Sequence, residues 1–195
     1  MYVMSDMGAE VIKVESHTRS RGGQGIYADN EARDQHWNRD GSFHALHRGK
    51  LAITLDLKVP EAVETFKDLV RVSDVLAENN RPGVMTRLGL GYDELRKIKP
   101  DLVYFSFSGF GQTGPMAERP AMDPVLQAFT GLMSVNKGND GIPHRINVIV
   151  CDMATSLYAF QALSAALYAK RNMAPGRYLD ANLMQGTAFL IAAVV

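Results

Sequence analysis

One carboxylate, Asp152, lies between a short apolar run and a long, almost unbroken apolar stretch in the sequence IVCDMATSLYAFQALSAALYAK, residues 149–170. The sequence places it where a predicted strand gives way to a predicted helix. A carboxylate there accepts hydrogen bonds from the first helix amides as an N-cap, which is the commoner role. The same place, at the carboxyl edge of a parallel sheet, also suits a carboxylate nucleophile. Both roles are compatible with the pattern.

A second candidate is the glycine-rich loop SGFGQTGP, residues 108–115, which follows a predicted strand. Backbone amides at Gly109, Gly111 and Gly114 are able to cradle a phosphate group or an oxyanion. The loop lacks the Gly-Lys-Ser/Thr ending of a P-loop, and by pattern alone a plain connecting loop is the more common explanation.

Charged groups elsewhere give weaker signals. Lys50 in HRGK and Arg87 in RPGVMTR offer cations for an anionic ligand, although most such side chains are merely solvated. His44 and His47 lie three residues apart, but no Cys or acidic spacing around the five histidines forms a convincing ligand set. We therefore expect no metal site.

Composition limits the classes of partner. Lys plus Arg number 21 and Asp plus Glu number 21, so the formal net charge is zero and no global field attracts nucleic acid or an anionic membrane. The single cysteine, Cys151, excludes an internal disulfide and fits a reducing, cytoplasmic compartment. The apolar tail at 183–195 is too short to predict a membrane span. The length of 195 residues allows one domain with a proper core.

The periodicity of apolar residues predicts alternating strands and helices. The segment from the first strand to about Arg48 is polar and Gly-rich, which is typical of a surface excursion. Strands separated by helices predict an α/β, Rossmann-like fold with a mostly parallel sheet and flanking helices. Strands are predicted at 9–15, 51–57, 74–78, 102–108 and 146–151, and helices at 59–72, 92–100, 123–133 and 153–170.

Several segments, taken in their order, closely resemble the family III CoA-transferases, the formyl-CoA and carnitine CoA-transferase group that includes the α-methylacyl-CoA racemases. They are MGAEVIKVE, RGKLAITLDLK, DVLAENNRPGVMTRLGLGYDELRKIKPDLVYFSFSGFGQTGP, DPVLQAFTGLM and GIPHRINVIVCDMATSLYAFQALSAALYAKR. The resemblance implies that residues 1–195 are the N-terminal part of a CoA-binding catalytic domain. It also implies that the first strand and the second domain of the family are missing, and that full-length members form interlocked homodimers.

The resemblance gives Asp152 the role of nucleophile. It would attack an acyl-CoA thioester to form a mixed anhydride, become an aspartyl-CoA thioester, and pass CoA to an acceptor carboxylic acid. Amides of the loop that contains Gly109, Gly111 and Gln112 would stabilise the developing negative charge.

The resemblance also implies contacts with CoA. Asn80 stands where an aromatic residue usually packs on CoA, so stacking area is lost. Ser16 replaces a frequent CoA-binding arginine, and Arg19 or Arg21 is expected to compensate. The residues that match family positions lining the CoA site are Lys50, Asn79, Asn80 and Arg87.

Two alternatives stay open. Racemases of the family use a His and Asp pair, and the histidine position before DPVLQ is Met122, which cannot accept a proton, so transfer is favoured over racemisation. The chain is alternatively a non-catalytic CoA-binding remnant. Because half of the family's supporting structure is missing, we expect the 195-residue chain alone to be aggregation-prone and inactive.

Overall fold

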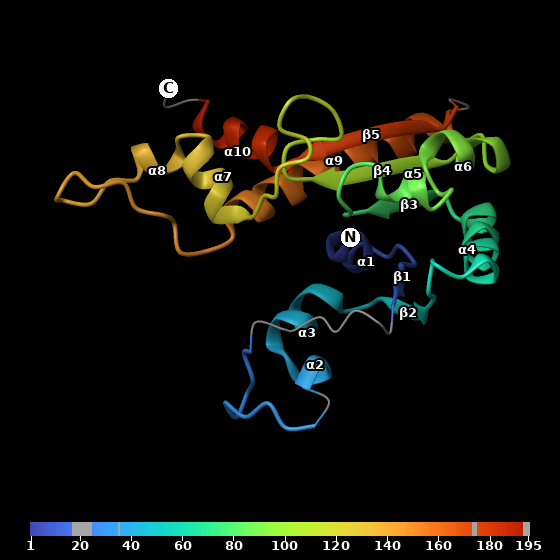
Figure 1. The fold of residues 1–195 in the computed structure, drawn as a ribbon, viewed down its shortest axis with the longest axis horizontal. Helices are drawn as coiled ribbons and strands as arrows, with labels where there is room; N and C mark the ends of the chain where they lie inside the picture. The colour runs from blue at the N-terminus through green and yellow to red at the C-terminus, as the bar shows by residue number, and fades with distance from the viewer. Residues whose placement is uncertain (17–24, 35, 173–174, 193–195) are drawn as a thin grey trace. The chain divides into compact units, whose positions relative to one another are not determined.

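The computed structural model describes residues 1–16, 25–34, 36–172 and 175–192 (Figure 1). Arg19 and Arg21, expected to compensate for Ser16, lie outside the described residues. Contacts within the chain divide it into two compact units, residues 1–66 and 67–195.

The first unit contains a two-stranded parallel sheet. Strands β1 (Ile12–Glu15) and β2 (Leu51–Thr54) pair with Ile12 opposite Leu51. The polar segment predicted as a surface excursion holds two short helices, and Asp40 caps the second of them. The helices that lie or begin in this unit are α1 (Tyr2–Asp6), α2 (His36–Arg39), α3 (Gly41–His47) and α4 (Pro60–Val72).

The second unit is built on a three-stranded parallel sheet. Strands β3 (Val75–Glu78), β4 (Val103–Ser108) and β5 (Arg177–Asn182) lie in the order β3-β4-β5. The buried, β-branched and aromatic sequence VYFSFS makes β4 the central strand. The helices of this unit are α5 (Val84–Arg87), α6 (Tyr92–Ile98), α7 (Asp123–Phe129), α8 (Leu132–Val135), α9 (Val150–Arg171) and α10 (Leu183–Ile191).

Helix α9 covers one face of this sheet (Figure 1). Ala159 of α9 packs against Phe105 of β4 and Ala181 of β5. The chain passes from β4 through α9 to β5, which lies parallel to β4, so the N-terminus of α9 faces the carboxyl ends of the strands. This connection delivers Asp152 to the edge of the sheet where α/β proteins bind ligands.

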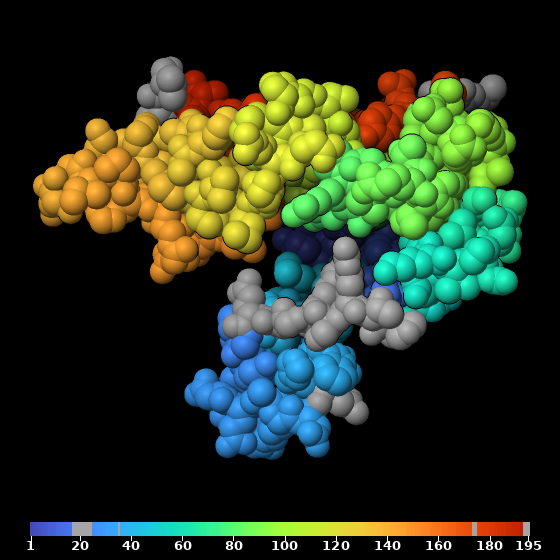
Figure 2. All heavy atoms as spheres, in the orientation of Figure 1, coloured from blue at the N-terminus to red at the C-terminus, as the bar shows by residue number. Residues whose placement is uncertain are grey.

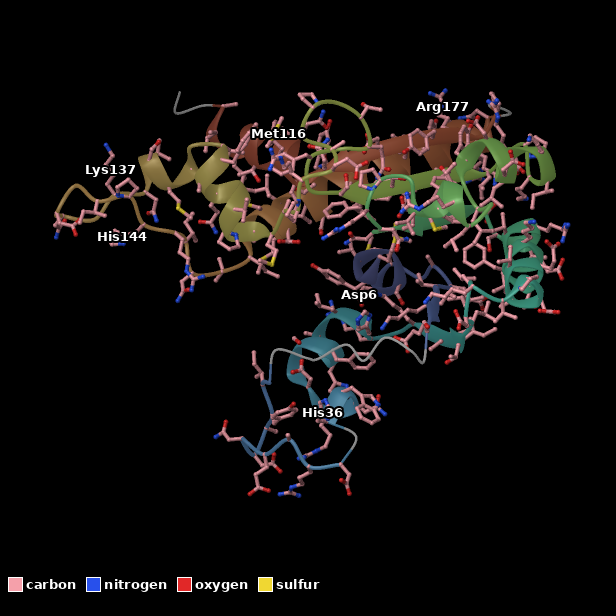
Figure 3. The ribbon with its side chains drawn as sticks, viewed as in Figure 1. Asp6, His36, Met116, Lys137, His144 and Arg177 are labelled. Carbon is pink, nitrogen blue, oxygen red and sulfur yellow. The ribbon has the colours of Figure 1, made fainter. Side chains whose placement is uncertain are left out.

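A second core joins α7, α9 and α10 to the loop after β4. Leu126, Cys151, Leu183 and Phe110 belong to one buried cluster. Figure 2 shows the yellow-to-orange segment that holds α7, α8 and the following loop at one end of the second unit. That loop carries Lys137 and His144, which are labelled in Figure 3.

The architecture is α/β with parallel sheets flanked by helices, as the sequence predicts. Strands expected at 9–15, 51–57, 74–78 and 102–108 are present as β1 to β4, and the described strands form two sheets. The strand predicted at 146–151 is wrong, because α9 already begins at Val150. Strand β5 was not predicted, since RYLDAN lacks a clear apolar alternation.

Candidate active site

Asp152 is the third residue of α9 and does not cap it. The N-cap position is Ile149, whose side chain forms no capping hydrogen bond. The prediction that Asp152 is the N-cap is therefore wrong. Its side chain is partly buried, and no ion pair joins it to any residue in the described ranges.

The cap of α9 comes from another helix. Asp123, the first residue of α7, is 6% exposed, and its Oδ2 accepts a hydrogen bond from the backbone N–H of Cys151 at 2.7 Å. The first-turn amide of α9 thus obtains its acceptor from a residue 28 positions earlier. Asp152 therefore does not act as the N-cap that the sequence pattern predicted.

Gln127 hydrogen-bonds the backbone at Ile146, the first residue of the segment that was predicted as a strand. It lies one turn after Asp123 on α7 and is 1% exposed. Its Oε1 accepts from the N–H of Ile146 at 2.7 Å, and its Nε2 donates to the carbonyl of Ile146 at 3.0 Å and to Asp123. This side-chain amide therefore satisfies both backbone groups of Ile146.

Two effects raise the pKa of Asp152. Burial of the carboxyl group contributes most, and repulsion from the Asp123 carboxylate adds to it, while a hydrogen bond from the residue's own backbone N–H lowers the pKa. A carboxylate with a raised pKa and no counter-cation is more basic, and therefore more nucleophilic, than a paired one.

The neighbouring thiol is not a competing nucleophile. Cys151 is fully buried, and its Sγ lies 3.7 Å from the carbonyl oxygen of Asp123. Burial raises the pKa of Cys151 to about 11. The thiolate is therefore scarce at neutral pH.

Two backbone amides of the glycine-rich loop donate hydrogen bonds within the chain. The N–H of Gly111 donates to Ser108 Oγ at 3.0 Å, and the N–H of Gln112 donates to Asp180 Oδ2 at 2.8 Å. The backbone amides of Gly111 and Gln112 thus have partners within the chain, and binding of an oxyanion by the amides of this loop stays a prediction. Gly111 has φ +92°, so backbone conformation favours glycine there, whereas a Cβ at Gly109 would lie 2.1 Å from Ala121 Cβ, so close packing favours glycine at that position.

Gln112 remains a candidate through its side chain. Its Nε2 is buried and has no hydrogen-bond partner among the described residues. A buried N–H without an acceptor is costly, and a ligand oxygen would satisfy it. The side-chain amide is thus a better candidate donor than the backbone amides of the loop.

The predicted CoA contacts of the second unit follow β3. Asn79 is exposed, and Asn80 donates its backbone N–H and its Nδ2 to Glu78 Oε2, at 2.7 and 3.1 Å. The Arg87 side chain folds back toward Gly83, where a Cβ would lie 3.1 Å from Nη1. Because β3 and β4 are parallel neighbours, Asn79 and Asn80 share the carboxyl edge with the glycine-rich loop. Lys50 lies in the first unit.

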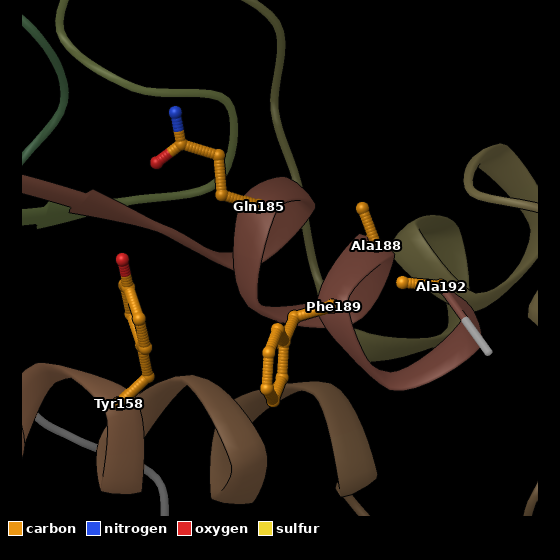
Figure 4. Close-up of a pocket in the computed structure, with 5 residues that line it drawn as sticks. All are labelled: Tyr158, Gln185, Ala188, Phe189 and Ala192. Carbon is orange, nitrogen blue, oxygen red and sulfur yellow. The ribbon is translucent and has the colours of Figure 1, made fainter.

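A cleft of about 450 Å³ lies between α9 and α10 (Figure 4). Tyr158 and Phe189 line it, with ring centroids 6.4 Å apart, together with Gln185, Ala188 and Ala192. The helices approach closely at Gly186, where a Cβ would lie 2.1 Å from Thr155 Oγ1. Tyr158 lies six residues after Asp152, about 9 Å along the helix axis.

Neither a cluster of potential metal ligands nor a membrane-spanning helix is found within the described ranges. No group of three or more His, Cys, Asp or Glu residues there is placed to hold a metal ion. No helix that the structure describes is long and apolar enough to cross a membrane.

Sequence reasoning missed Asp123 and Gln127. Their spacing of four residues places them on one face of a predicted helix. This spacing is the only local feature of the sequence that indicates that they act together. Their hydrogen-bond partners Ile146 and Cys151 lie 19 to 28 residues further along the chain, so the pairing depends on the tertiary fold.

The comparisons with known proteins agree with one another. The model of CoA-transferase family III matches residues 1–195. The chain is 39% identical, over 99% of its length, to an acetyl-CoA:oxalate CoA-transferase of Acetobacter aceti, and covers 49% of that protein. It is 35% identical, over 98% of its length, to a succinyl-CoA:glutarate CoA-transferase of Mus musculus, and covers 43% of it.

Solved structures with a similar fold also match nearly the whole of this chain. The chain matches the crystal structure of a CAIB/BAIF family protein from Brucella suis with a TM-score of 0.84 and 35% identity, covering 97% of this chain and 50% of that one. It matches Rv3272 from M. tuberculosis with a TM-score of 0.82 and 30% identity, covering 98% and 50%. The chain spans about half the length of the curated relatives it matches.

Proposed function

Because this chain belongs to CoA-transferase family III, we propose that the full-length protein moves CoA from an acyl-CoA thioester to a carboxylic acid, with Asp152 as the nucleophile. One observation carries the proposal. A partly buried carboxylate with a raised pKa stands at the carboxyl edge of a parallel sheet, and Asp123 has taken over the capping role that would otherwise explain it.

The proposed reaction proceeds through covalent intermediates on Asp152. A carboxylate oxygen attacks the thioester carbonyl, the C–S bond breaks, and CoA thiolate leaves a mixed anhydride. The thiolate then attacks the Asp152 carbonyl carbon, which releases the donor acid as a carboxylate and leaves an aspartyl-CoA thioester. The acceptor carboxylate attacks this thioester, and the expelled thiolate takes the acceptor acyl group from the new anhydride, which regenerates Asp152.

Several groups would support these steps. The anhydride preserves the reactivity of the thioester, so no step has to form an activated acyl group from a free acid. The buried Nε2 of Gln112 is available to an oxyanion or an acceptor carboxylate. We further propose that CoA contacts the four residues predicted from the resemblance, and that the full-length protein is a homodimer. Those four residues are Lys50, Asn79, Asn80 and Arg87.

The names of two relatives indicate a class of acid for the acceptor of this protein. Oxalate and glutarate are dicarboxylic acids, and they name the acids used by the two similar enzymes of Acetobacter aceti and Mus musculus. We propose that the acceptor of this protein is a short dicarboxylic acid. A panel of such acids, with monocarboxylic acids as controls, tests this class.

Racemisation is the less favoured alternative. It needs a base on the substrate's α-carbon, and Met122, at the N-cap of α7, is 68% exposed and has no basic nitrogen. In the full-length protein, α-proton exchange of a chiral 2-methylacyl-CoA without an acceptor acid would contradict transfer as the main activity.

The functional test uses the full-length protein with an acyl-CoA donor and the acid panel. Asp152→Asn is expected to lower turnover at least about a thousandfold, because an amide cannot form the anhydride. Asp140→Asn, an exposed change on the loop after α8, is the matched control. Retention of most of the turnover by Asp152→Asn would remove the nucleophile from the proposal.

A further inference from the structure

The glycine-rich loop after β4 is fixed to β5 and α10 by two backbone groups (Figure 1). The carbonyl oxygen of Gly109 accepts a hydrogen bond from the N–H of Met184, in the first turn of α10, at 3.0 Å. The N–H of Gln112 donates to Asp180 Oδ2, on β5, at 2.8 Å. Asp180 lies 68 residues after Gln112, so the tertiary fold, and not the local sequence, sets the position of the loop.

The alternation of side chains along β5 explains why this strand offers polar groups to the loop. Ala181 packs against Ala159 of α9. Because alternate residues of a strand point to opposite faces, Asp180 and Asn182 lie on the face away from α9. A Cβ at Gly111 would lie 3.2 Å from Asn182 Nδ2 and 3.5 Å from Asp180 Oδ2, so the loop passes directly over these two side chains. The polar residues that prevented prediction of β5 from the sequence are therefore the ones that contact the loop.

Gln112 carries an N–H group that needs an acceptor. Its Nε2 is buried and has no hydrogen-bond partner among the described residues. The loop also packs near the proposed nucleophile, because Phe110 shares a buried cluster with Cys151, the residue before Asp152. Neighbouring glycines restrict the backbone of the loop little, so the orientation of the Gln112 side chain depends on contacts such as the one with Asp180.

We propose that Asp180 is a positioning residue for transfer: its carboxylate holds the backbone of Gln112, so that Nε2 donates to a negatively charged oxygen of the reaction. This inference rests on the proposed function and adds Asp180 to it. The oxygen is either the oxyanion that forms at a carbonyl carbon under attack or a carboxylate oxygen of the acceptor acid. Both are strong acceptors, and a fixed N–H stabilises them better than a mobile one.

The test is a double-mutant cycle in the full-length protein, with the rate of CoA transfer as the readout. Gln112→Ala is expected to lower kcat/KM for the acceptor acid about a hundredfold, and Asp180→Ala about tenfold. If Asp180 acts through Gln112, Asp180→Ala causes no further loss once residue 112 is alanine. Asp180→Asn keeps an oxygen acceptor for the N–H and is expected to retain most of the activity. Losses that multiply in the double variant would overturn the proposal.

Asp140→Ala is the matched control. Asp140 is also exposed, and its Oδ1 accepts a hydrogen bond from the N–H of Ile142 at 2.9 Å on the loop after α8. The substitution removes the same kind of bond from a loop outside the proposed site, so transfer is expected to stay at the wild-type rate. An equal loss of transfer in Asp140→Ala and Asp180→Ala would overturn the positioning role.

The kinetic constants distinguish the two oxygens. If Gln112 donates to the oxyanion, Gln112→Ala and Asp180→Ala both lower kcat and leave KM unchanged, because the oxyanion is absent from the bound substrates. If Gln112 donates to the acceptor carboxylate, both substitutions raise the KM of the acceptor acid and leave that of the acyl-CoA unchanged. A change confined to the KM of the acyl-CoA would overturn the proposal for both oxygens.

Amide hydrogen exchange keeps this inference apart from the proposed reaction. In full-length Asp180→Ala, the peptide that contains residues 109–112 is expected to exchange several-fold faster than in wild type and in Asp140→Ala, at an unchanged melting temperature. Faster exchange, in a protein whose wild type transfers no CoA, would retain Asp180 as the residue that holds the loop and reject the transferase proposal. Wild-type exchange in Asp180→Ala, with transfer intact, would reject the positioning role alone.

Discussion

Two aspartates near helix N-termini, Asp40 at α3 and Asp152 at α9, have opposite environments. Asp40 is fully buried and accepts backbone hydrogen bonds from Ser42, Phe43, Gly25 and Ile26. A hydrogen bond from the Ser42 hydroxyl and these backbone bonds lower the pKa of Asp40 to about 2. The pKa of Asp152 is raised instead.

The difference lies in which residue provides the cap. Asp40 caps its own helix, so hydrogen bonds stabilise its charge and its role is structural. At α9 the cap comes from Asp123, and Asp152 retains a carboxylate that no cation in the described residues neutralises. Proximity to a helix N-terminus is therefore not enough to separate a structural carboxylate from a reactive one.

Asp40→Ala should give the largest stability effect of the changes that test this comparison. It leaves several backbone N–H groups without their acceptor, so the melting temperature should fall clearly. Because the folded pKa of about 2 lies below the ordinary 3.8, Asp40 stabilises above pH 3.8, and this contribution is lost as pH falls toward 2. Urea unfolding at several pH values should show that the free energies of unfolding of wild type and variant converge over that range.

Asp34→Ala, an exposed change, is the control. An equal loss of stability in Asp34→Ala would contradict the capping role of Asp40.

Asp123→Ala should destabilise by about 1–3 kcal/mol, because the N–H of Cys151 and the Nε2 of Gln127 both lose a buried acceptor. Transfer by the full-length protein should fall as well, since the start of α9 is no longer held. Urea unfolding measures the first effect, with the exposed Glu118→Ala as control. A loss no larger than in the control would show that Asp123 does not anchor α9.

Asp123→Asn should change the pH dependence of transfer. Transfer requires ionised Asp152 and is lost as pH falls through its pKa. The substitution keeps an oxygen acceptor for Cys151 but removes the charge that helps to raise the pKa of Asp152. The acidic limb of kcat/KM in the full-length protein should therefore move to lower pH. An unmoved limb, or one at higher pH, would contradict the influence of Asp123 on Asp152.

Asp152→Asn should have the smallest effect on stability. A folded pKa above the unfolded value means that the ionised group costs folding energy at neutral pH. Removal of the charge should leave stability unchanged or raise it by about 1 kcal/mol or less. A clear fall in the free energy of unfolding would assign Asp152 the same structural role as Asp40.

Local patterns predicted much of this fold. Short segments rich in apolar and β-branched residues located β1 to β4, and the apolar face of α4 with Pro60 at its start located that helix. The same reasoning failed at 146–151, where the β-branched residues are typical of a strand but the side chain of Gln127 satisfies the Ile146 backbone. Propensity is overridden there by a tertiary contact.

The candidate site was also predicted from the sequence only in part. The resemblance identified Asp152, but the sequence does not show that its cap lies on α7. The amides of Gly109 and Gly111 stay predicted ligand-binding groups, and the structure adds that close packing at Gly109 and a positive φ at Gly111 favour glycine at these positions. Only the three-dimensional contacts separate these roles.

Trapping a covalent intermediate tests the central claim most directly. The full-length protein is incubated with an acyl-CoA, treated with hydroxylamine and digested, and the peptide that contains Asp152 is analysed by mass spectrometry. Attack on an anhydride or thioester at Asp152 predicts a hydroxamate on that side chain, formed only when acyl-CoA is present. Transfer activity together with an unmodified Asp152 peptide, or a hydroxamate on another carboxylate, would contradict the account.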